Sequence, residues 1–139
     1  MKVKDVMHSG VTWVSPSTTV SEIAKKMREQ DIGAIPVGEH DKLIGMITDR
    51  DIVCRGLANG RDPGKLTARE VMSKGISYCR SDDDLDDAIE SMSKKHIRRL
   101  TVIDDNKRMV GMLSLGDISR RADKQHCVEF LKAVSAHHA

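Results

Sequence analysis

Aromatic residues are almost missing from this chain, whose 139 residues include one Trp, one Tyr and one Phe. A core must therefore be built from aliphatic side chains and from the eight Met, whose flexible thioethers fill gaps between packed elements. The shortage also argues against a nucleic-acid surface on which bases stack on aromatic rings. The chain also lacks a strong electrostatic field of one sign, because its 23 Lys and Arg are nearly balanced by 21 Asp and Glu. No DNA or RNA partner is expected.

The sequence also shows no sign of paired cysteines, of a signal peptide or of a membrane-spanning segment. Cys54, Cys79 and Cys127 are odd in number and widely spaced, without the Cys-x-x-Cys pair of zinc or redox sites. The first residues lack the apolar run of a signal peptide, and no stretch approaches the about 20 apolar residues that cross a bilayer. We therefore expect reduced cysteines, a cytoplasmic location and no membrane partner.

What the chain does contain is an internal duplication. The Val-Met pair at positions 6–7 recurs 65 residues later at positions 71–72, and the apolar positions that follow keep the same shift. After one inserted residue the shift becomes 66, so that residues 45–48 match residues 111–114. Because a unit of about 60 residues buries little surface alone, we expect the two copies to fold together.

The hydrophobic pattern predicts the same element order, β-α-β-β-α, in both copies. Hydroxyl or acidic residues precede each amphipathic helix, as is typical of N-caps, and the helices are expected to end near Gln30 and Lys95. Polar turn residues separate the two later strands of each copy, which indicates a hairpin. The expected strands are residues 11–14, 34–37 and 43–48, and then 76–79, 100–103 and 109–114. The fold class is α/β.

The duplication also suggests domain limits. We expect a first repeat at residues 1–60, a linker at 61–67, a second repeat at 68–122 and a terminal segment at 123–139, because the glycines and the proline of residues 56–64 mark a connecting loop.

The terminal segment predicts a helix over residues 124–136. Its apolar residues Cys127, Val128, Leu131 and Val134 are expected on one side, packing on the module or on a second subunit.

The most faithfully repeated polar feature lies where the second hairpin strand gives way to a helix. There a hydroxyl residue is followed three positions later by Asp, as Thr48 with Asp51 and again as Ser114 with Asp117. An Asp in the first helical turn can accept two hydrogen bonds from a ribose diol, while the hydroxyl and nearby N–H groups meet a sugar or phosphate oxygen. The alternative is simple helix capping. Spacing alone leaves both explanations open.

Two motifs connect this pattern to a known family. Residues 32–37 read Ile-Gly-Ala-Ile-Pro-Val and residues 48–51 read Thr-Asp-Arg-Asp within the duplicated β-α-β-β-α order. Over residues 1–122 the chain resembles the CBS-domain pair, or Bateman module, and its size is similar to that of small stand-alone bacterial members. The resemblance implies tandem repeats packed through their sheets about a pseudo-twofold axis.

The resemblance further implies a non-catalytic regulatory module. Family members bind adenosine-containing ligands in clefts between the repeats, so AMP, ADP or ATP is expected, with NAD or S-adenosylmethionine as further possibilities and no obligatory cofactor. It also implies a homodimer that acts on a regulated protein whose identity stays unknown. We keep a second hypothesis, a nucleotide-independent homodimeric scaffold for stress-related interactions.

Carried over residue by residue, the resemblance assigns ribose and phosphate contacts to Ser114 and Asp117 in one cleft and to Thr48 and Asp51 in the other. Gly33 and Ala34 become Arg98 and Arg99 in the second copy, so the clefts should differ, and the cleft that combines these four residues with Ser114 and Asp117 is expected to be the better site. No catalytic constellation or metal site is expected. The remaining assignments are Ile32, Gly33 and Ala34 along the adenine, Thr12 beside them, and Arg98 and Arg99 toward the phosphates.

Overall fold

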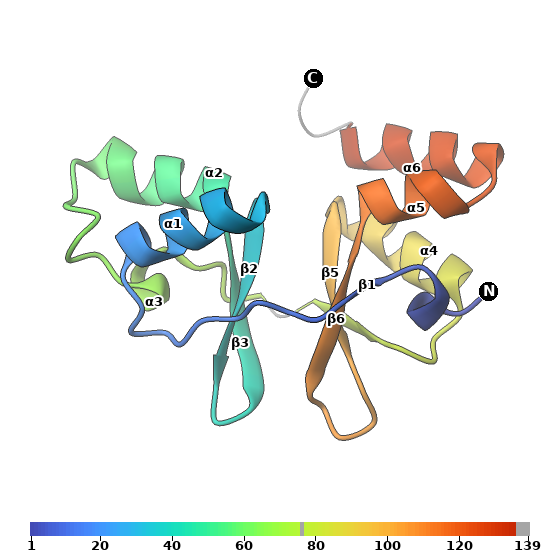
Figure 1. The fold of residues 1–139 in the computed structure, drawn as a ribbon. Coiled ribbons are helices and arrows are strands. Elements are labelled where there is room, and N and C mark those ends of the chain that lie inside the picture. Colours follow the sequence, from blue (N-terminus) through green and yellow to red (C-terminus); the bar gives the residue numbers. More distant parts are fainter. Residues whose placement is uncertain (76, 136–139) are drawn as a thin grey trace. The chain divides into compact units, whose positions relative to one another are not determined.

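The structure is a computed structural model, and it describes residues 1–75 and 77–135. The chain forms two compact units, which we call the middle unit, Thr12–Ile76, and the terminal unit, Met1–Val11 together with Ser77–Ala139. Figure 1 shows the elements of both. The units do not coincide with the sequence repeats, because each unit contains the first short segment of the other repeat. The mixed α/β character expected from the sequence is confirmed.

The middle unit is built on the β2–β3 hairpin. Its strands pair antiparallel, as the predicted hairpin requires, and Ala34 lies opposite Thr48. Helix α1 begins after Thr19, whose hydroxyl accepts a hydrogen bond from the Glu22 amide at 3.3 Å. It ends at Gln30, before a left-handed Asp31. The elements of this unit are α1 Val20–Gln30, β2 Ala34–Glu39, β3 Lys42–Thr48, α2 Asp49–Asp51, a π-helical turn Ile52–Gly56, a 3-10 turn Leu57–Asn59 and α3 Ala68–Val71.

The outer strands of the middle unit are reduced to single bridges. Val14 forms a parallel bridge with Val37, and Ser73 forms an antiparallel bridge with Met46 on the other side of the hairpin. The expected strand at residues 11–14 is therefore wrong in extent, since one bridge at Val14 is all that the structure records for it.

The terminal unit has the fuller sheet, with four strands in the order β1-β6-β5-β4. Strand β4 runs parallel to β5, whereas β1 and β5 are antiparallel to β6. The predicted strand at residues 76–79 corresponds to β4, although Ile76 lies outside the described residues. Strand β1 was not predicted. The elements are a 3-10 turn Val3–Asp5, β1 His8–Ser9, β4 Tyr78–Arg80, α4 Leu85–Lys95, β5 Arg99–Ile103, β6 Met109–Ser114, α5 Leu115–Arg121 and α6 Lys124–Ser135.

Strand β1 can approach β6 because position 111 is glycine. A Cβ atom added to Gly111 would lie 2.5 Å from the backbone oxygen of His8 and 2.9 Å from Sδ of Met7. The missing side chain thus lets residues 7–9 cross β6 at close range, which brings His8 over the carboxyl end of that strand.

Each unit has a separate hydrophobic core. In the middle unit Ile23, Ile35 and Ile47 are fully buried, and Val71 of α3 joins them. In the terminal unit Phe130 of α6 is fully buried in a cluster with aliphatic residues of α4, β5 and β6. The one phenylalanine therefore contributes to the core. Among the described residues, no helix is long and apolar enough to cross a membrane.

Helix α6 packs on α4 and α5 of its own unit, which is one of the two alternatives expected (Figure 1). Its buried side carries Phe130 and Val134, with Cys127 packed against the same cluster. Val128 and Leu131 are each half exposed, so the expectation that they share the buried side was wrong. The helix ends at Ser135, and the expected last residue, Ala136, lies outside the described part.

Candidate functional site

The two repeated hydroxyl-carboxylate pairs form complete capping boxes at the helix starts. In the middle unit the Asp51 amide donates to Oγ1 of Thr48 at 3.1 Å, and the Thr48 amide donates to Oδ2 of Asp51 at 2.9 Å. In the terminal unit the Asp117 amide donates to Oγ of Ser114 at 3.1 Å, and the Ser114 amide donates to Oδ2 of Asp117 at 3.0 Å. Reciprocal bonds of this kind fix the rotamer of each carboxylate.

The backbone just before each second strand is tied to the same helix start. The Asp49 amide donates to the carbonyl of Gly33 at 3.0 Å, and the Leu115 amide donates to the carbonyl of Arg98 at 2.9 Å. The segment entering β2 or β5 therefore lies against the start of α2 or α5 in its own unit. The ligand contacts expected for residues 32–34 and 98–99 stay predictions.

The remaining predicted residues differ in exposure. Ala34 is buried in β2, whereas Ile32 is partly exposed and presents an apolar surface before the strand. Arg98 and Arg99 are both exposed, and Arg99 is paired with Ser114 across the β5–β6 ladder. Thr12 donates its hydroxyl hydrogen to the side-chain oxygen of Gln30 at the end of α1.

Within the middle unit, the structure brings Thr48 and Asp51 together with Gly33. Within the terminal unit it brings Ser114 and Asp117 together with Arg98 and, across the ladder, Arg99. The preferred cleft expected from the sequence mixes Gly33 and Ala34 with residues of the other unit. That composite site therefore stays a prediction.

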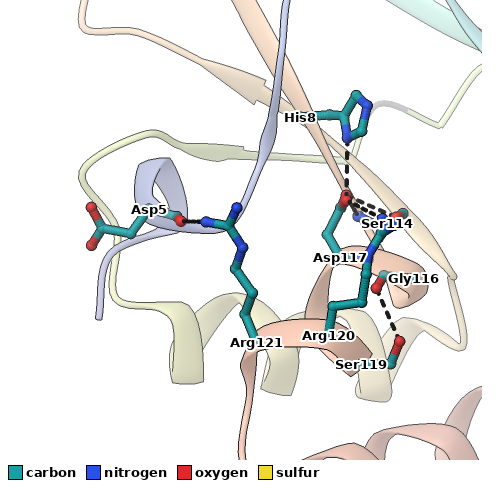
Figure 2. A network of polar contacts seen from close by, with 8 residues as sticks. All are labelled: Asp5, His8, Ser114, Gly116, Asp117, Ser119, Arg120 and Arg121. Carbon is teal, nitrogen blue, oxygen red and sulfur yellow. Dashed lines mark hydrogen bonds and ion pairs between the residues drawn. The ribbon is translucent and has the colours of Figure 1, made fainter.

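Asp117 has two further partners that sequence reasoning missed (Figure 2). Nδ1 of His8, on β1, lies 3.3 Å from Oδ1 of Asp117, and Nη2 of Arg120, one turn along α5, lies 3.2 Å from the same oxygen. The Ser114 hydroxyl donates to Oδ2 at 2.8 Å. The Asp117 side chain is only 6% exposed, so these groups surround a nearly buried carboxylate. The spacing of Arg120 from Asp117 was visible in the sequence, whereas the pairing of β1 with β6 was not.

Asp51 has a different set of neighbours. Its ion pair is with Nε of Arg55, at 3.9 Å, which is too long for a hydrogen bond. The guanidinium of Arg55 is instead directed at the end of α3, where Nη1 donates to the backbone oxygen of Met72 at 3.0 Å. The two copies of the motif therefore share their capping box and differ in what contacts the outer oxygen.

Comparison with known proteins identifies the family that this geometry belongs to. The model of the CBS domain matches residues 3–55 and again residues 68–124, which together cover most of the chain. The chain belongs to the CBS domain family. The resemblance drawn from its two motifs is thereby confirmed, and both matches contain one hydroxyl-carboxylate pair.

Several CBS proteins are similar over nearly their whole length. Hypoxic response protein 1 of Mycobacterium tuberculosis is 40% identical over 132 residues, which cover 94% of this chain and 92% of that protein. The CBS domain-containing protein YhcV of Bacillus subtilis is 44% identical over 117 residues, covering 84% of this chain and 82% of its own.

Solved CBS structures share the fold. The crystal structure of hypoxic response protein I, which holds two coordinated zinc ions, superposes with a TM-score of 0.79 at 40% identity, over 88% of this chain and all of that one. The CBS domain pair of protein MJ0100, solved with 5′-methylthioadenosine and S-adenosylmethionine, gives a TM-score of 0.77 at 31% identity, over 86% of this chain and 98% of that one. In residues 1–75 and 77–135 of the present chain, no three His, Cys, Asp or Glu gather as metal ligands would.

Proposed function

We propose that this CBS-domain pair is a non-catalytic regulatory module that binds an adenosine-containing ligand through its ribose. The carrying observation is that each unit holds an Asp carboxylate at a helix start, oriented by its own capping box. A carboxylate with fixed oxygens accepts both hydroxyls of a diol at little further entropic cost, because its rotamer is already set. The complex of the MJ0100 pair with two adenosine compounds supports the same ligand class.

The adenine would lie along the segment that enters the first hairpin. Ile32 offers a partly exposed apolar side chain there, and Gly33 has no side chain to keep a planar base at a distance. Thr12 belongs to this proposal as a neighbouring polar group.

The phosphates would be met by the exposed guanidinium groups of Arg98 and Arg99, because the planar fork of arginine matches phosphate oxygens. We therefore propose AMP, ADP or ATP first, with NAD and S-adenosylmethionine as the other adenosine ligands to be tested. The proposed ligand is a regulatory effector rather than an obligatory cofactor.

Regulation requires that the ligand favour one state of the protein over another. We propose a homodimer as the unit that responds. The turn after Asp51 supports this, because Val53 and Leu57 lie four positions apart and both are about half exposed. Apolar pairs at this spacing lie on one helical face and suit a contact with a second copy.

A cytoplasmic location is part of the proposal. It agrees with the thiols of Cys54, Cys79 and Cys127, which are free in the structure.

One observation favours a second candidate, a scaffold that binds no nucleotide. The capping boxes alone explain why a hydroxyl and an Asp recur at positions 48 and 51 and at 114 and 117, since capping stabilises a helix without any ligand. The scaffold would then use its exposed apolar helix faces to recruit partners.

Equilibrium titration separates the two candidates. The purified chain is titrated with AMP, ADP, ATP, NAD and S-adenosylmethionine, and the titrations are repeated with Asp51→Asn and Asp117→Asn. The sensing proposal expects saturable binding of at least one compound that is weakened by one or both substitutions. Saturation by none of the five would favour the scaffold, and binding untouched by both substitutions would remove the ribose assignment.

A further inference from the structure

The two repeated carboxylates are not equally available to a ligand, although their sequence motifs match. A carboxylate offers about four positions at which hydrogen bonds are accepted. Asp117 uses all of them inside the protein: Oδ2 accepts from the amide and the hydroxyl of Ser114, and Oδ1 faces His8 and Arg120. With 6% of its side chain exposed, this carboxylate has no accepting position left for a ribose hydroxyl.

Asp51 uses far less of its capacity. Its Oδ2 accepts one hydrogen bond, from the amide of Thr48. Among the described residues, Oδ1 accepts none, and its ion-pair partner Arg55 stands 3.9 Å away while donating to backbone oxygens. Among the described residues, the Thr48 hydroxyl also makes no hydrogen bond to the Asp51 carboxylate, in contrast to the Ser114 hydroxyl, which donates to Asp117. Within the described part of the chain, Oδ1 of Asp51 is therefore an oriented carboxylate oxygen to which no group donates a hydrogen bond.

We propose that the ribose diol binds first at Asp51 and that Asp117 is a second, weaker position. There His8 and Arg120, which we call the latch, occupy the carboxylate and must be displaced before a diol can bind. The proposal rests on the proposed function and assigns an order to its two carboxylates. That order is the reverse of the one expected from the sequence, where the arginines near Asp117 favoured that side.

The latch can open because its two donors are anchored weakly. The side chains of His8 and Arg120 are 75% and 70% exposed, so both can move into solvent without breaking a core contact. They reach Asp117 from different elements, His8 from β1 and Arg120 from α5 (Figure 2). Among the described residues, the charged and polar groups that contact the carboxylate are thus His8, Arg120 and Ser114 of the capping box.

Because the latch competes with the ligand for Oδ1, removing it should strengthen binding at Asp117. A ligand whose binding must first break a charge-assisted hydrogen bond loses affinity by the cost of that bond. We expect His8→Gln and Arg120→Gln each to raise the affinity of the second position several-fold, and the double variant to raise it about tenfold or more. Binding at Asp51 should not change.

The test titrates 5′-methylthioadenosine into the full chain by isothermal calorimetry. This probe presents a ribose diol without a phosphate, so the loss of Arg120 does not also remove an attraction to a phosphate charge. AMP is titrated in parallel. Arg121→Gln is the matched control, because Arg121 is the next residue of α5 and donates to the backbone oxygen of Asp5 rather than to Asp117.

The expected result is that Asp51→Asn removes the tighter binding event and Asp117→Asn removes the weaker one. The weaker event should tighten in the latch variants and stay unchanged in the Arg121 control. A tighter event lost with Asp117→Asn, or latch variants that bind no better than the wild type, would overturn the order while leaving the nucleotide proposal intact. If neither these probes nor ADP, ATP, NAD and S-adenosylmethionine bind the wild type, the proposed function itself fails.

Folding is controlled separately. Asp117→Asn removes part of a capping box and can destabilise α5. His8→Gln and Arg120→Gln leave both capping-box bonds in place, the one from the Ser114 amide to Oδ2 of Asp117 and the one from the Asp117 amide to Oγ of Ser114. Thermal unfolding of every variant shows which ones remain folded at the titration temperature. The affinity change of the latch variants decides the proposal even where Asp117→Asn is unfolded.

Discussion

Gly111→Ala should destabilise the terminal unit because a methyl group has no room where β1 crosses β6. The added Cβ would lie 2.5 Å from the backbone oxygen of His8 and 2.9 Å from Sδ of Met7. The thioether can rotate away, but the backbone oxygen belongs to a strand paired with β6 and can retreat only by loosening that ladder. Overpacking of this kind costs about 1–3 kcal/mol. It outweighs the gain of up to about 1 kcal/mol that alanine brings by restricting the unfolded chain.

Gly116→Ala is the matched control, and it is expected to stabilise the protein rather than destabilise it. Position 116 lies in α5, where an added Cβ would meet Oγ of Ser114 at 3.6 Å and Nη2 of Arg120 at 3.9 Å, both ordinary contacts. Alanine in a helix is favoured over glycine by about 0.5–1 kcal/mol. Urea unfolding followed by circular dichroism gives both free energies. A Gly111→Ala variant at least as stable as the wild type would refute the close approach of β1, and with it the position of His8 over Asp117.

Three further predictions concern the terminal unit. Phe130→Ala should cost about 3–5 kcal/mol in urea unfolding, because its ring is fully buried, whereas Leu131→Ala, half exposed, should cost far less; equal losses would contradict the orientation of α6. The hydrogen bond to Asp123 raises the pKa of His126. The protonated imidazole therefore stabilises the folded chain fully below the pKa that His126 has in the unfolded chain, and this contribution is lost as the pH rises through the raised pKa. His126→Gln should reduce the dependence of the free energy of unfolding on pH between about pH 5 and 8, and an unchanged dependence would contradict the role of this hydrogen bond. Burial raises the pKa of the Cys79 thiol to about 12, so it should react with a disulfide reagent only after unfolding, and rapid labelling of the native protein would be the contrary result.

Local patterns were enough to predict most of the fold. The hairpins at β2–β3 and β5–β6 and the ends of α1 and α4 follow from alternation, turn residues and caps, all of which act over a few positions. The orientation of α6 was predicted wrongly, because Val128 and Leu131 fit a helical stripe as well as the residues that are buried. Only packing against α4 and α5 selects the side that carries Phe130.

The sequence predicted the hydroxyl-carboxylate motif that the two copies share. It did not predict the contacts in which the two copies differ. The pairs at positions 48 and 51 and at 114 and 117 are visible as a duplicated motif, and their capping boxes depend on neighbouring residues alone. The contact between His8 and Asp117 joins residues 109 positions apart and depends on β1 pairing with β6. A repeat in the sequence cannot reveal that the first segment of one copy packs with the other copy, so this asymmetry required the structure.

The central claim, that an adenosine ligand is held by its ribose diol, is tested most directly by comparing the affinities of AMP and of its 2′-deoxy analogue for the wild-type chain. The account predicts saturable binding of AMP and a loss of about tenfold or more for the analogue, because a hydroxyl donating to a charged carboxylate contributes roughly 1.5–3 kcal/mol. Equal affinities for the two nucleotides, or binding of neither, would contradict it.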